Sequence, residues 1–100
     1  MSETLLVKQI QLALAPLGVR LFRNNCGAYK KGKFFIKYGL CPGSSDLIGI
    51  FAGRFVAIEV KVEGGVMSDS QEAFLKMVKD NGGIGFEARS VNDAVARFTL

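Results

Sequence analysis

The sequence predicts one α/β domain over residues 1–100, in which helices flank a mixed sheet in the order α-β-β-β-β-α-β-α. Three observations predict this class. Apolar residues repeat with helical spacing at the start of the chain, two β-rich runs flank Ala52-Gly53, and Ser68 and Ser90 each begin a helix-capping sequence. The length of 100 residues suits one small domain, and the hydrophobic content of 49% excludes a disordered chain.

The first predicted helix covers residues 2–16. Its apolar residues follow the spacing of a buried stripe, at Leu6, Ile10, Ala13 and Leu14. Glu3 lies three residues before Leu6, which places it on the same inward face. An acid in the first turn can complement the helix dipole. It can also be a carboxylate at the rim of a functional site, and both interpretations stay open.

Strands are predicted at 19–23 and 34–38, with turns at 24–27 and 30–33. Aromatic residues alternate here with lysines: Tyr29, Phe34, Phe35 and Tyr38 with Lys30, Lys31, Lys33 and Lys37. Such a mixture is typical of surfaces that hold nucleic-acid backbones and exposed bases. A charged, partly solvated hairpin would have the same composition, so the pattern alone does not decide between them.

The charge is unevenly distributed along the chain. The net charge is +4, but the segment from Thr4 to Gly43 contains seven basic residues and no acid. The remaining residues have a net charge of −3. A basic half that faces an acidic cluster suits a polyanion held over a metal site.

The central hairpin pairs residues 47–51 with residues 55–60. A two-residue loop at Ala52-Gly53 places Phe51 opposite Arg54, and counting outward brings Asp46 opposite Glu59. Opposed side chains on one face have Cβ atoms about 5 Å apart. Lys61 shares the face of Glu59 because side chains alternate along a strand. We therefore expect two acids and an ammonium group to converge, a set that can hold a divalent metal and position a water.

An ordinary alternative exists for this hairpin end, in which Glu59 and Lys61 form a solvated ion pair. The composition of the same face argues against it, since Ile48, Ile50 and Phe55 make the face apolar near the turn. A solvent-exposed face would carry polar residues throughout. We expect a half-buried charge cluster, which is unfavourable unless it is paired or binds a metal.

The next helix is predicted over residues 68–80. Ser68 and Gln71 have the spacing of a capping box, in which the two side chains bond reciprocally to the backbone. Gln71 also lies three residues before Phe74 and so faces inward. Capping and a role in the site are equally consistent with this position. A strand at 84–88 and a last helix capped by Ser90 complete the chain.

The composition excludes several classes of function. The sequence contains no histidine, which excludes Ser-His-Asp and Cys-His catalysis and imidazole-ligated metals. Any metal must therefore be held by oxygen atoms, which are the ligands that Mg²⁺ and Mn²⁺ prefer. Cys26 and Cys41 are too few for a zinc site or a disulfide scaffold, and we expect two reduced, half-buried thiols. The apolar runs are too short for a membrane span and no signal segment opens the chain, so we expect an intracellular protein.

The spacing of Asp46 and Glu59-Val60-Lys61 resembles the signature of the PD-(D/E)XK nucleases. The surrounding residues resemble the VRR-NUC (virus-type replication-repair nuclease) branch, in four blocks taken in order: 23–25, 43–49, 58–61 and 68–74. The resemblance covers nearly the whole chain and indicates a single-domain member. Ser45 departs from the pattern, because the signature usually has proline there, where it stiffens the backbone and does no chemistry.

The resemblance implies a restriction-endonuclease-like fold and a role for each residue of the signature. Asp46 and Glu59 would bind Mg²⁺ or Mn²⁺, with the Val60 carbonyl as a further ligand, and Lys61 would orient or help deprotonate the attacking water. Glu3 and Gln71 match positions that line the site. The implied reaction is hydrolysis of DNA phosphodiester bonds.

The resemblance also implies partners and a setting. The resemblance to single-domain members implies a homodimer that cuts branched DNA such as four-way (Holliday) junctions. It also implies a location in the cytoplasm of a bacterium or a phage-infected host. We expect DNA contacts from Arg20, Arg23, Asn24, Lys30, Lys31, Lys33, Lys37 and Ser44. One alternative is a DNA-binding module without catalytic turnover. Another is an RNA-cutting or toxin-like nuclease of the same fold, which would differ only in its substrate.

Overall fold

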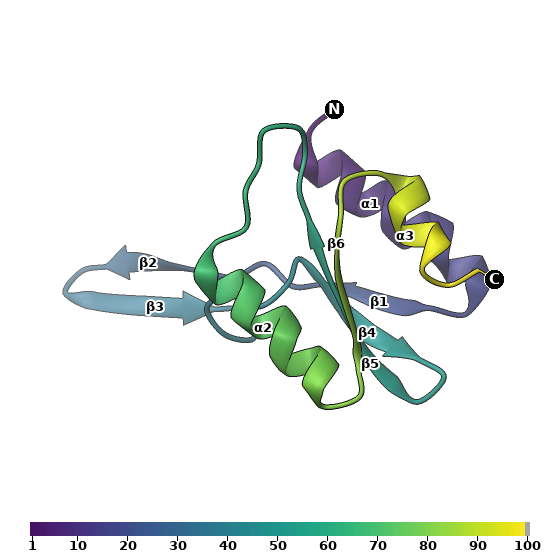
Figure 1. Ribbon diagram of the computed structural model, residues 1–100. Helices are drawn as coiled ribbons and strands as arrows, with labels where there is room; N and C mark the ends of the chain where they lie inside the picture. The colour runs from purple at the N-terminus through teal and green to yellow at the C-terminus, as the bar shows by residue number, and fades with distance from the viewer. Residues whose placement is uncertain (100) are drawn as a thin grey trace.

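A four-stranded mixed sheet forms the centre of the computed structural model, which describes residues 1–99 (Figure 1). The strand order is β1-β4-β5-β6, in which the β1–β4 and β4–β5 pairs are antiparallel and the β5–β6 pair is parallel. The strands are β1 (Arg20–Arg23), β4 (Leu47–Phe51), β5 (Arg54–Val60) and β6 (Ile84–Ala88). This mixed sheet flanked by helices is the α/β arrangement that the sequence predicts.

Helices cover the two faces of this sheet unequally. Helix α1 (Glu3–Leu14) and the short helix α3 (Val91–Ala96) pack together on one face, over the inward side chains of β5. Helix α2 (Asp69–Asp80) covers the opposite face, where Phe74 and Leu75 pack on Ala57. Val56 and Ile58 belong to the first cluster and Ala57 to the second, as the alternation of a strand requires. None of the helices within residues 1–99 has the length and apolarity to cross a membrane.

The predicted helix starts follow from side-chain caps. Ser68 accepts a hydrogen bond from the Gln71 N–H and Gln71 Oε1 accepts one from the Ser68 N–H, so the predicted capping box is present. Ser90 caps α3 through the Asp93 N–H. Helix α1 ends at Leu14, earlier than predicted, because the chain tightens into a 3₁₀ turn around Pro16, which has no N–H for the helical ladder.

The predicted element order is wrong by one strand. The end of one predicted turn, the start of the next and the two residues between them form β2 (Gly27–Lys31), which pairs with β3 (Phe34–Tyr38) in a separate two-stranded sheet. Strand β2 contains glycine, alanine and two lysines, so it lacks the apolar alternation that identifies a strand in sequence. Its strand conformation depends on backbone pairing with β3. The resulting hairpin projects from the domain, whose longest dimension is 51 Å (Figure 1).

The outer face of the β4–β5 hairpin near its turn is more exposed than predicted. Ile50 is 58% exposed and Phe55 is also exposed, whereas Ala57 further along β5 is buried. Helix α2 packs on β5 and β6 and leaves this face of β1 and β4 uncovered. The predicted half-buried environment is therefore confined to the end of the hairpin that carries Glu59.

Candidate metal-binding and catalytic site

Two carboxylates meet where β4 begins and β5 ends. The predicted pairing of Phe51 with Arg54 is present, and the register continues to Leu47 opposite Ile58, which brings Asp46 beside Glu59. Asp46 is fixed from two sides. Its Oδ2 accepts a hydrogen bond of 2.9 Å from the Val60 N–H, and its backbone carbonyl accepts one of 2.7 Å from the Asn24 N–H.

Glu59 is a buried acid that favours its neutral form. Its side chain is 2% exposed. Burial is the largest cause that raises its pKa to about 8, followed by the neighbouring carboxylate of Asp46, while the Lys61 ammonium opposes the shift. One oxygen, Oε1, accepts a hydrogen bond from Gln71, and the other, Oε2, has no hydrogen-bond partner among residues 1–99. A buried oxygen of this kind is available for a ligand.

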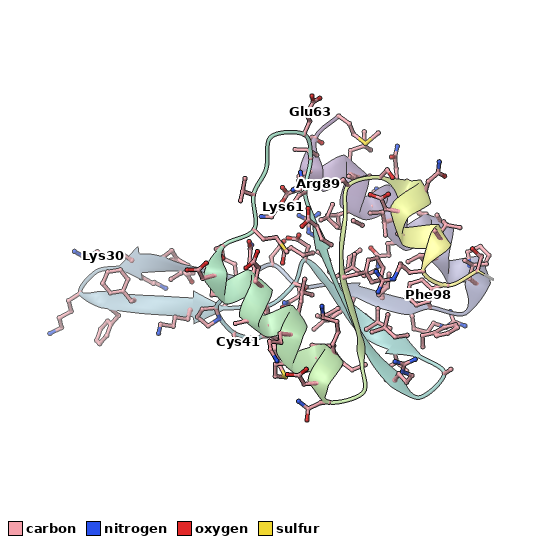
Figure 2. All side chains as sticks on the ribbon, in the orientation of Figure 1. Lys30, Cys41, Lys61, Glu63, Arg89 and Phe98 are labelled. Atoms are coloured by element: carbon pink, nitrogen blue, oxygen red, sulfur yellow. The ribbon has the colours of Figure 1, made fainter. Side chains whose placement is uncertain are left out.

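The ammonium group of Lys61 lies beside the acid pair. Its Nζ is 3.9 Å from Glu59 Oε1, and its backbone N–H donates to the Ala88 carbonyl on β6. Figure 2 shows Lys61 at the end of β5, where the chain leaves the sheet. The alternative of a solvated Glu59–Lys61 pair is wrong, because both side chains are largely buried.

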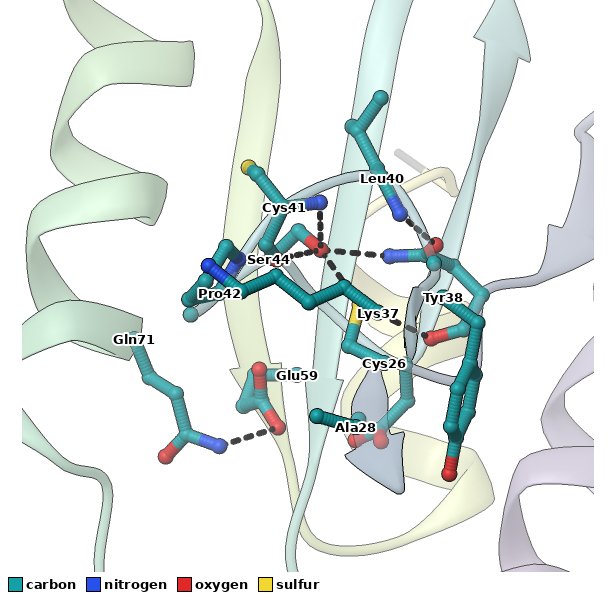
Figure 3. Close-up of a pocket in the computed structure, with 15 residues that line it drawn as sticks. Cys26, Ala28, Lys37, Tyr38, Leu40, Cys41, Pro42, Ser44, Glu59 and Gln71 are labelled. Atoms are coloured by element: carbon teal, nitrogen blue, oxygen red, sulfur yellow. Dashed lines mark hydrogen bonds between the residues drawn. The ribbon is translucent and has the colours of Figure 1, made fainter. Parts of the chain in front are cut away.

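Gln71 combines the two roles that the sequence left open. Its Oε1 closes the capping box on the Ser68 N–H at 2.9 Å. Its Nε2 donates a hydrogen bond of 3.2 Å to Glu59 Oε1 (Figure 3). The cap fixes the orientation of the amide, and the amide in turn orients the carboxylate.

Glu3 lies at the edge of this site and not on the inward face. The prediction of an inward position is wrong: Glu3 occupies the first turn of α1, before the buried stripe begins at Leu6, and its side chain is exposed. Its negative charge nevertheless acts on the site, because it is one of the causes that raise the pKa of Glu59.

A pocket of ≈ 580 Å³ opens over the carboxylates. Its walls are the base of the β2–β3 hairpin, the loop 39–44 and Gln71 of α2 (Figure 3). Lys37 extends across it from β3, so a cationic side chain and the two acids line the same space. A pocket with this lining suits a phosphate chain held above a cation.

Two residues predicted to contact DNA, Asn24 and Ser44, are buried beneath this pocket. Asn24 Nδ2 donates to Ser44 Oγ at 2.8 Å and to the Ser45 carbonyl at 2.9 Å, and Asn24 Oδ1 accepts from the Leu40 N–H at 3.0 Å. These bonds hold the loop that precedes Asp46. Sequence reasoning missed this role, because the bonded residues lie about twenty positions apart and no local pattern links them.

The thiols differ from the prediction in one respect. Both cysteines are free, and Cys26 is partly buried with its Sγ 2.8 Å from Ser44 Oγ. Cys41 is exposed, so the prediction of a half-buried thiol is wrong for this residue. It follows the hairpin on a surface loop and lies outside both clusters of buried apolar side chains.

The predicted basic residues separate into three groups by position. The hairpin lysines Lys30, Lys31 and Lys33 are exposed beyond the pocket that Lys37 lines. Arg23 pairs with Leu47, next to Asp46, and its Nε donates to Asn25 Oδ1. Arg20 pairs with Ile50 at the other end of the strand and lines a different pocket, so the structure does not bring it to the carboxylates.

The donor atoms fit a hard divalent cation. Residues 1–99 contain no cluster of three or more His, Cys, Asp or Glu side chains able to hold a metal ion. Asp46 and Glu59 instead supply two carboxylates, and the Oε2 of Glu59 is free to coordinate. Mg²⁺ is commonly bound through one or two carboxylates with waters and substrate phosphates completing its octahedron.

The sequence model of the VRR-NUC domain matches residues 22–92, from β1 into α3. The matched region contains Asp46, Glu59, Lys61 and Gln71, whereas Glu3 lies outside it. A comparison with curated protein sequences finds no match.

Proposed function

Because the chain belongs to the VRR-NUC family, which implies a nuclease of the PD-(D/E)XK type, we propose that it is an Mg²⁺- or Mn²⁺-dependent endonuclease acting on DNA. The observation that carries this proposal is the buried pair of Asp46 and Glu59, with one unpartnered carboxylate oxygen beside the Lys61 ammonium. A protein that only binds DNA has no need of two adjacent buried acids, which repel a polyanion.

Each residue of the site has a separate role in the proposed reaction. Asp46 and Glu59, with the Val60 carbonyl, would hold the metal, which when bound polarises the phosphoryl oxygen and lowers the pKa of water. Lys61 orients the attacking water and offsets charge that develops on the phosphate. Gln71 keeps Glu59 in place through its bond to Oε1. Glu3 adds negative charge at the rim, which favours cation binding.

The test is cleavage of labelled junction, flap, single-stranded and duplex DNA with and without Mg²⁺ or Mn²⁺. We expect Asp46→Asn, Glu59→Gln and Lys61→Met each to lower the rate at least about a hundredfold while DNA binding is retained. Glu63→Gln is the control, because it makes the same chemical change on an exposed loop beyond the site (Figure 2). Binding without cleavage by the wild type would favour a DNA-binding module, and cleavage of RNA alone would change the substrate.

We further propose a homodimer that selects branched DNA, including four-way junctions. The uncovered face of β1 and β4 supports a dimer, because Phe22 (67% exposed) and Ile50 (58% exposed) lie there with Phe55. A two-fold pair of sites would match a two-fold substrate. Sedimentation of the wild type should give a dimer that Ile50→Lys dissociates. Val66→Lys, which adds the same charge on an exposed loop, should leave the dimer intact, and a monomeric wild type would exclude this proposal.

A further inference from the structure

The β2–β3 hairpin is an arm with two chemically different faces. Its ten strand residues are all exposed, and the two strands pair only with each other among residues 1–99. The register sets Lys31 opposite Phe34 and Tyr29 opposite Ile36. Opposed residues share a face and successive residues alternate, so the composition of each face follows from this register.

We call the two surfaces of the arm the aromatic face and the lysine face. The aromatic face contains Tyr29, Phe34, Ile36 and Tyr38, with Lys31 at its outer end. Two of its rings are neighbours, since the centroids of Tyr29 and Tyr38 are 6.4 Å apart. The lysine face contains Lys30, Lys37, Ala28 and Phe35. Lys33 lies in the turn that joins β2 to β3, at the tip of the arm.

The arm connects directly to the pocket over the carboxylates. The cross-strand pair Ala28 and Lys37 lines that pocket, which orients the lysine face toward it. From the aromatic face, only Gly27 and Tyr38 at the base of the arm reach the pocket. A strand whose phosphates follow the lysines into the pocket would therefore pass along the edge of the aromatic face.

The exposed side chains of the aromatic face indicate that this face binds a ligand or partner. A two-stranded hairpin is at best marginally stable alone, and a contiguous group of exposed aromatic side chains marks a binding surface. Residues 24–45 carry four lysines and no acid, so a second copy of the chain would oppose two arms of like charge. A ligand that is both anionic and aromatic would be attracted by the lysines and could also pack on the aromatic side chains. A nucleic acid with unpaired bases has this chemistry.

We propose that the aromatic face stacks on unpaired bases of the DNA substrate while the lysine face holds the adjacent phosphates. The identity of the ligand as DNA rests on the proposed nuclease function. Bases within an intact duplex are already stacked on one another, so the arm discriminates DNA with unpaired bases next to the cut strand from continuous duplex.

The composition provides an internal reporter for this contact. The sequence contains two tyrosines and no tryptophan, and both tyrosines lie on the aromatic face. Tyrosine emission therefore reports on that face alone. Titration with a single-stranded oligonucleotide in EDTA should quench the emission, after correction for absorption by the DNA. The same sequence as a blunt duplex should bind more weakly and leave the emission unchanged.

Phe34 and Phe35 form a matched pair for mutation. They are adjacent and similarly exposed, at 65% and 74%, but they lie on opposite faces of the arm. Phe34→Ala should weaken single-strand binding about tenfold, within the range for loss of one base–aromatic stack, and change duplex binding less than twofold. Phe35→Ala should leave the ratio of the two affinities unchanged. Equal effects of the two variants, or no quenching by single strands, would overturn the proposal.

Three further outcomes separate this inference from the proposed dimer and from the proposed nuclease function. A dimer that Phe34→Ala dissociates in sedimentation would assign the aromatic face to a second copy of the chain and overturn the proposal. Cleavage of DNA by a wild-type protein that shows no single-strand preference would overturn it while leaving the nuclease function in place. Quenching by single strands without cleavage in Mg²⁺ or Mn²⁺ would support the arm and refute the nuclease.

Discussion

Replacement of Glu59 by glutamine should remove the contribution of this residue to the pH dependence of stability in metal-free protein. The pKa of Glu59 rises from 4.5 to about 8 in the folded state, mainly through burial. Between these values the folded state retains a proton that the unfolded state has lost. Wild-type stability therefore falls as pH rises through this window, by up to about 1.4 kcal/mol per pH unit. A glutamine does not titrate and removes this contribution.

The assay is urea denaturation in EDTA at pH 5, 6, 7, 8 and 9. The stability of Glu59→Gln relative to the wild type should increase from pH 5 to pH 8 and then level off. Glu63→Gln, on the exposed loop after β5, should follow the wild type at every pH. Parallel curves for Glu59→Gln and the wild type would refute the assignment of Glu59 as a buried acid with a raised pKa.

Three other substitutions test the framework around the site by urea denaturation. Asn24→Ala should destabilise the protein by about 3 kcal/mol, because it removes three hydrogen bonds, two of them buried; an effect below about 1 kcal/mol would contradict this. Ser45→Ala should stabilise it by about 1 kcal/mol, since this buried hydroxyl has no partner among residues 1–99; a loss of stability would indicate an unseen partner. Gly49→Ala should cost about 3 kcal/mol or more, because an added Cβ would lie 1.7 Å from the Arg20 carbonyl oxygen; a tolerated alanine would contradict the close β1–β4 pairing.

The part of the site that depends on local pairing could be predicted from the sequence. The turn at Ala52-Gly53 fixes the register of β4 and β5, and this register places Asp46 beside Glu59. The capping box at Ser68 likewise fixes the start of α2 and the orientation of Gln71. Each follows from residues that are close in sequence or joined by a short turn, where few alternatives compete.

A missing apolar pattern in β2 and long-range contacts elsewhere account for what the sequence did not predict. Strand β2 has no apolar alternation and forms by pairing with β3. The hydrogen bonds from Asn24 to Ser44 and Ser45 span about twenty positions, and no local sequence pattern predicts them. The exposure of Ile50 and Phe55 depends on where α2 packs, which the spacing of residues within one strand does not determine.

Binding of Mn²⁺ at pH 8 in the absence of DNA tests most directly whether Asp46 and Glu59 share a divalent ion. Free Mn²⁺ can be followed by electron paramagnetic resonance during titration of the protein. The wild type and Glu63→Gln should remove Mn²⁺ from solution in a saturable manner, whereas Asp46→Asn and Glu59→Gln should not. Binding by Glu59→Gln equal to that of the wild type would contradict the shared site and, with it, the catalytic role of the carboxylate pair.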